Sequence, residues 1–187
     1  TTLVLLSGLS SALPTADFTP RQAAACFIVG KTALPAEVAD VVTSVQSAIT
    51  CSATAKTLSG VPDVTSGAVS FSSIDFSKSP DSPLSFALKQ FATANPLAST
   101  DLQQFQDSLN VYLATEAGIR STGGSLAIKV PKFFLEMQVS RIQTAQGSAP
   151  KAVGLQVAHL RDKVTKNAAG ESKAVLDQVV ALAAQLN

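Results

Sequence analysis

The sequence predicts an all-α protein, a single-domain bundle of five or six helices with an irregular strap, residues 61–80, ahead of the third helix. Apolar side chains recur at spacings of three and four residues over most of the chain beyond residue 35, which is the period of an amphipathic helix. Clusters of Pro, Gly and Ser separate these segments, and the sequence contains neither an internal repeat nor an interdomain linker. Hydrophobic residues make up 46% of the chain but aromatic residues only 5%, a composition that suits closely packed helices.

Residues 36–58 are expected to form a long amphipathic helix, because a proline precedes them and apolar residues follow the helical period. Gly60 and Pro62 end this helix. In the strap, turn residues dominate, and the alternation of apolar and polar side chains over 69–76 fits either a short hairpin or an irregular segment. We favour the irregular segment. In the helix predicted over 36–58, the apolar positions are Val38, Val41, Val42, Val45 and Ile49.

In the second half of the chain, the pattern of apolar residues predicts helices joined by short links. Ser99 or Thr100 is expected to cap one of them, with Asp101 in its first turn, where the helix dipole favours a negative charge. The segment 131–146 is apolar over most of its circumference, which predicts a central helix. The expected helices are 83–91, 100–122, 131–146, 151–169 and 172–186.

Residues 1–21 are expected to be a signal peptide followed by a short pro-segment. Leu3–Leu9 is an uncharged apolar run too short to span a bilayer, and the small residues Ser10–Ala12 follow it, which is typical of a secretory leader. A helical domain over 22–187 would then be the secreted, extracellular product. The alternative is that Leu3–Leu9 is a buried element of that domain. The mature chain could begin after Ala12, Ala16 or Arg21.

Cys26 and Cys51 are the two cysteines, and we expect them to form one disulfide in an oxidising compartment. Closing a loop of about 25 residues stabilises a fold by roughly 3.5 kcal/mol through the entropy of the unfolded chain. If a helix runs from Pro35 to Cys51, the residues before Pro35 must run nearly extended, back along that helix. A helix over 23–31 would instead require the following helix to break or cross steeply. Two free thiols are the remaining alternative.

The charge of the chain argues against a strongly electrostatic partner, because the net charge is +1. Residues 1–128 hold six Lys or Arg and nine Asp or Glu, whereas residues 129–187 hold eight and four. The basic part could contact anionic lipid or polysaccharide, or it could complement the acidic part within one fold. No aromatic side chains interleave with Arg161, Lys163 and Lys166, so we expect no nucleic-acid binding. We also expect no transmembrane segment.

Sequence motifs for chemistry are missing: there is no nucleophile elbow, no phosphate loop, no dinucleotide-type glycine pattern and no zinc spacing. We therefore predict no catalytic residue, no cofactor and no metal site. The single histidine, His159, is expected to pair with Asp162 on a solvated helix face. Phe133, Phe134 and Met137 could line an apolar ligand pocket, because methionine adapts to varied shapes, although core packing explains the same spacing.

The leader, one cysteine pair and an Ala- and Ser-rich helical body resemble the uncharacterised small secreted proteins of filamentous fungi. The segment Met137–Gly147 is similar to a signature of that group. A fainter similarity, in composition and helix pattern alone, links the chain to fungal hydrophobic-surface-binding and cell-wall mannoprotein domains, which are helical and bind apolar surfaces or lipids. Cys26 and Cys51 count against this second resemblance, since those domains generally need no cysteine pair.

These observations predict a secreted, non-enzymatic interaction or binding protein for an apolar ligand or surface. One alternative is a secreted enzyme of unrecognised type that uses carboxylates or His159. Another is a structural component of the wall or matrix. A closed apolar cavity would favour a ligand carrier, and carboxylates converging in an open cleft would favour the enzyme.

Overall fold

The computed structural model describes residues 25–187, so the expected signal peptide and pro-segment lie outside the described residues. The described part contains six α-helices and one three-stranded antiparallel sheet, which makes the all-α prediction wrong. The helices are α1 (Ala36–Val45), α2 (Pro83–Gln90), α3 (Leu102–Thr122), α4 (Lys129–Ala145), α5 (Val157–Asn167) and α6 (Lys173–Ala184). The strands are β1 (Thr50–Lys56), β2 (Pro62–Ser66) and β3 (Val69–Ser70), in the order β1-β2-β3.

The long helix expected over 36–58 is the main correction. Its apolar period is real, since Val38, Val45 and Ile49 are buried, but α1 ends at Val45 and the chain becomes extended at Ile49. The following residues are rich in Thr and Ser, which favour strands and turns over helix interiors. Thr50 and Cys51 pair with Thr65 and Val64 of β2, so tertiary pairing overrides the helical continuation.

The strap expected over 61–80 also needs correction. Its first part is the β2–β3 hairpin over residues 62–70, which we did not expect. Most of 69–76, where we favoured an irregular segment over a hairpin, does not pair as a hairpin of its own: after the two residues of β3, the chain forms 3₁₀ turns over Phe71–Ile74 and Phe76–Lys78. The apolar residues of these turns are buried against Tyr112 of α3. The Tyr112 hydroxyl donates a hydrogen bond of 2.7 Å to the carbonyl oxygen of Ile74, which holds the turns onto the helix.

The disulfide prediction is confirmed, because Cys26 is bonded to Cys51. The bond ties the segment before α1 to the start of β1. The expected geometry, an extended segment lying back along one helix, is wrong because Cys51 lies in a strand.

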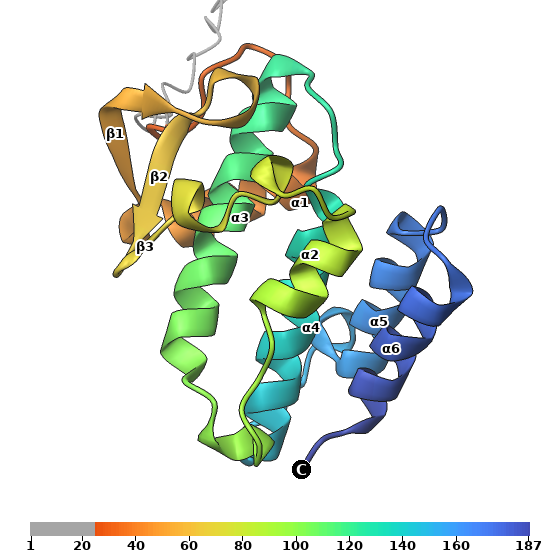
Figure 1. The fold of residues 1–187 in the computed structure, drawn as a ribbon. Helices are drawn as coiled ribbons and strands as arrows, with labels where there is room; N and C mark the ends of the chain where they lie inside the picture. The colour runs from red at the N-terminus through yellow and green to blue at the C-terminus, as the bar shows by residue number, and fades with distance from the viewer. Residues whose placement is uncertain (1–24) are drawn as a thin grey trace, which may run out of the picture.

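Helix α3 lies at the centre of the molecule, with the sheet on one side and α4 on the other (Figure 1). Asp101 caps it by accepting a hydrogen bond from the Gln104 backbone N–H, rather than Ser99 or Thr100. Gly118 allows the backbone at Phe27 and the side chain of Val61 to approach closely. The five helices expected after residue 82 are all present. The prediction of a central helix over 131–146 is confirmed by α4, which packs against α2, α3 and α5 and is largely buried. Helix α6 packs on α5, and both lie away from the sheet (Figure 1).

Candidate functional site

A cleft of about 300 Å³ lies where α1, α3, α4 and α5 meet beside the 3₁₀ turn η6 (Val153–Leu155). Seven of its lining side chains are charged, although charged residues make up only 14% of the chain. The acidic ones are Glu37, Glu116 and Glu136, and the basic ones are Arg120, Lys129, Lys132 and Lys163. The apolar ones are Val38, Val41, Leu113, Phe133 and Leu155.

Glu116 and Lys132 form a buried ion pair at the floor of this cleft. Glu116 is 4% exposed and Lys132 is 8% exposed, and the Lys132 Nζ lies 3.0 Å from Glu116 Oε2. The other carboxylate oxygen of Glu116 accepts a hydrogen bond of 2.9 Å from Arg120 Nε, one turn along α3. Both oxygens of Glu116 are therefore occupied by cations. Removing Glu116 would leave the buried Lys132 without its closest counter-ion, which is costly.

Glu136 is the second acidic group of the floor, and it is only loosely paired. Its Oε1 lies 3.8 Å from Lys132 Nζ, which Glu116 already engages more closely. Burial raises the pKa of the Glu136 carboxyl above its ordinary value, Glu116 adds to the increase by repulsion, and Lys132 and Lys163 oppose it. Glu136 is thus a carboxyl group that holds its proton more tightly than an exposed glutamate does.

The Phe133 ring gathers three ammonium groups at the edge of the cleft. The Nζ atoms of Lys132, Lys163 and Lys129 lie 3.8, 5.0 and 6.0 Å from the ring centroid. The face of an aromatic ring attracts cations, which explains how one ring holds the three lysines together. Within residues 25–187, neither Lys129 nor Lys163 has a carboxylate within 4 Å, so both charges remain available to an anion.

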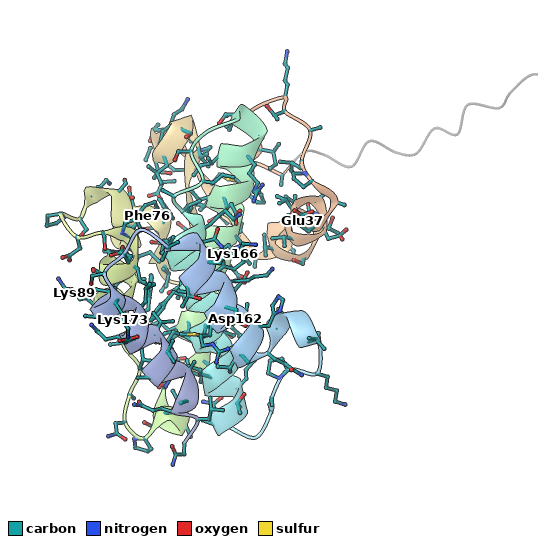
Figure 2. The ribbon with its side chains drawn as sticks, turned by 90° about the vertical axis from the view of Figure 1, so that its right-hand side faces the viewer. Glu37, Phe76, Lys89, Asp162, Lys166 and Lys173 are labelled. Carbon is teal, nitrogen blue, oxygen red and sulfur yellow. A yellow bond between two sulfur atoms is a disulfide. The ribbon has the colours of Figure 1, made fainter. Side chains whose placement is uncertain are left out.

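Part of the rim of the cleft is apolar. Leu155 of η6 lines the cleft and is 52% exposed, and its neighbour Val153, outside the lining, is 71% exposed. Across the cleft lies α1, which contributes Val38 and Val41. In Figure 2, α1 carries the labelled Glu37 and lies above the light-blue turn of η6 on the same side of the molecule. The cleft therefore combines a charged floor, two lysines without a carboxylate partner among the described residues, and apolar side chains at its rim.

The structure separates the residues predicted for an apolar pocket. Phe133 lines the cleft, but Phe134 and Met137 are fully buried in the hydrophobic core. His159 is exposed on α5, and the expected partner Asp162 accepts hydrogen bonds from Arg161 instead, at 2.9 and 2.7 Å. A ligand in this region stays a prediction.

Sequence reasoning missed the charged floor. One signal was available: Glu116 and Arg120, and likewise Lys132 and Glu136, are spaced i, i+4 and lie next to apolar positions of two helices. A charge on the buried face of a helix needs a partner. The pairing of Glu116 with Lys132 across two helices could not be found in this way, because it depends on how α3 and α4 pack.

Two further findings concern metal binding and membrane spanning in residues 25–187. In residues 25–187, no three His, Cys, Asp or Glu side chains gather in a way that could hold a metal ion. Over the same residues, no helix has the length and hydropathy needed to cross a membrane.

The fold and the cleft define a small disulfide-bonded domain in which helices and a three-stranded sheet present one amphipathic, cation-lined cleft. Comparison with protein families matches residues 28–187 to the family described as Domain of unknown function (DUF7143), and the chain belongs to that family. The expectation of an uncharacterised family is confirmed in this form. No curated protein and no solved structure matches the chain.

Proposed function

We propose that the protein is a secreted, non-enzymatic binding protein whose cleft takes a single amphipathic anion, such as the carboxylate form of a medium-chain fatty acid. The observation that carries the proposal is the pair of lysines, Lys129 and Lys163, beside an exposed apolar rim. A carboxylate held near both ammonium groups would gain charge-assisted hydrogen bonds. Its chain would cover Leu155 and the apolar side chains of α1.

Secretion is part of the proposal. The Cys26–Cys51 disulfide supports it, because such bonds persist in oxidising compartments and are rare in the cytosol. The apolar leader expected over residues 1–21 supports it from the sequence side.

The enzyme alternative draws support from Glu116 and Glu136, which converge at the floor of an open cleft. Carboxylate catalysis of the glycosidase type requires two groups that can each act on the substrate. Arg120 and Lys132 already occupy both oxygens of Glu116, which leaves Glu136 as the single loosely held carboxyl group. We therefore place binding ahead of catalysis.

Isothermal titration calorimetry of the full chain with sodium octanoate tests the proposal. Octyltrimethylammonium chloride is the matched probe, with the same chain length and the opposite charge. We expect octanoate to bind at the cleft and the cation not to bind there. Changing Lys129 and Lys163 together to Gln should weaken octanoate binding at least about tenfold, because each lost charge-assisted contact is worth about 1.5 kcal/mol or more.

The double change Lys151→Gln, Lys166→Gln is the matched control, since neither residue lines the cleft and both are exposed. It removes the same charge and should leave binding unchanged. Equal binding of both probes, or equal weakening by both double variants, would contradict the proposal. The wall or matrix alternative predicts no octanoate binding at the cleft at all.

A further inference from the structure

A second pocket lies at the other end of α4 and contains a buried arginine. The pocket has a volume of about 410 Å³ and lies between the chain that follows α2, the helix α4, and the end of α6. Arg141 lines it and is only 2% exposed. No Asp or Glu side chain lines this pocket, although the last residue, Asn187, does, and within residues 25–187 no carboxylate lies within 4 Å of the guanidinium group.

The partners of Arg141 are all neutral. Its Nε and Nη2 donate to the carbonyl oxygen of Gln185, at 3.2 and 2.8 Å, and its Nη1 donates to the side-chain oxygen of Gln138. Gln138 is itself oriented by a hydrogen bond of 2.8 Å from its Nε2 to the carbonyl oxygen of Phe91. The guanidinium group is therefore held in a fixed position by both neighbouring segments.

This arrangement leaves part of the guanidinium unused. Arginine has five N–H donors, and the three hydrogen bonds above account for one on Nε and one on each terminal nitrogen. One donor remains on Nη1 and one on Nη2. A buried charge normally has a counter-ion, because removing it from water without one is costly. The Gln185 carbonyl at the end of α6 offsets this cost only in part, as a helix C-terminus carries a partial negative charge.

We infer that the Arg141 pocket binds a small organic monocarboxylate. A carboxylate supplies one negative charge against the one buried positive charge, and its two oxygens match the donors that remain on the guanidinium group. A phosphate dianion would bring a second charge that no lining residue neutralises. The leucines of the wall, Leu88, Leu97 and Leu182, favour a ligand with a short apolar chain.

Titration of ¹⁵N-labelled protein with sodium butyrate, at constant ionic strength maintained with sodium chloride, tests this inference. We expect saturating shifts in the Arg141 Nε–H signal and in the backbone amides of Gln138 and Gln185. Arg141→Lys keeps the charge but loses the planar pair of donors, and should weaken binding about tenfold. Sodium phosphate, titrated in the same way, should give no saturating shift at these positions.

A second variant leaves Arg141 in place. Ala94 is exposed and lines the pocket, so Ala94→Trp should obstruct it and abolish the butyrate shifts. Ala98→Trp is the matched control, because Ala98 is also exposed, four residues away in the same segment, and does not line the pocket. Non-saturating shifts, unchanged binding in Ala94→Trp, or binding of phosphate in place of butyrate would each overturn the inference.

Discussion

At the scale of single residues, the protonation of Glu136 links the stability of the fold to pH. Its pKa is raised above the ordinary value of 4.5, chiefly by burial. The folded state therefore holds this proton at pH values where the unfolded chain has released it. The resulting stabilisation is fully present below pH 4.5 and is lost as pH rises through the raised pKa.

Glu136→Gln replaces the carboxyl group with a neutral side chain of nearly the same shape. We expect the variant to be more stable than the wild type at pH 8, by on the order of 1 kcal/mol, and to match it near pH 4. Urea denaturation at several pH values measures this difference. Glu37→Gln, an exposed change on the rim of the same cleft, should shift stability by less than about 0.5 kcal/mol at either pH. A stability gap that narrows with rising pH would contradict the argument.

At the scale of elements, the close contact of α3 with the segment before α1 and with the residue just before β2 depends on the absence of a side chain at Gly118. A Cβ atom there would lie 2.6 Å from the carbonyl oxygen of Phe27 and 2.7 Å from both methyl groups of Val61. Phe27 and Val61 are fully buried, so neither can move aside cheaply.

Gly118→Ala should therefore destabilise the fold by about 1–3 kcal/mol, even though alanine favours a helix more than glycine does. Gly170→Ala is the matched control, because nothing lies within 4 Å of its Cβ position and its backbone requires no positive φ. The control should change stability by less than about 0.5 kcal/mol, as is usual for surface substitutions. A Gly118→Ala variant as stable as the wild type would show that the two segments can separate freely.

The helices and strands also show which parts of the fold the sequence could predict and which it could not. The helices after residue 82 follow from their own apolar period and from their Pro, Ser and Gly boundaries, which are local signals. The turn from helix to strand between Val45 and Thr50 is not local, because β1 exists through its pairing with β2 and its disulfide. The ion pair of Glu116 with Lys132 likewise depends on the packing of α3 on α4, so the floor of the cleft was missed.

At the scale of the whole molecule, the sheet and the helices share one hydrophobic core, which extends without interruption from Phe27 to Ala183. A continuous core favours unfolding as a single cooperative unit. The Cys26–Cys51 bond constrains only the N-terminal part of this unit, since it closes a loop of 25 residues around α1.

Replacing both cysteines by serine should therefore lower the free energy of unfolding of the entire protein, not only of the segment that the bond encloses. The chain-entropy model gives a loss of about 3.5 kcal/mol for a loop of this length. Guanidinium denaturation can be monitored both by far-UV circular dichroism and by the fluorescence of Tyr112. For the variant, both signals should show one coincident transition at a lower midpoint. Reduction of the disulfide in the wild type should give the same result. Two separated transitions, with the Tyr112 signal lost after the helical signal, would mean that the sheet side unfolds on its own and that the shared core does not couple the two sides.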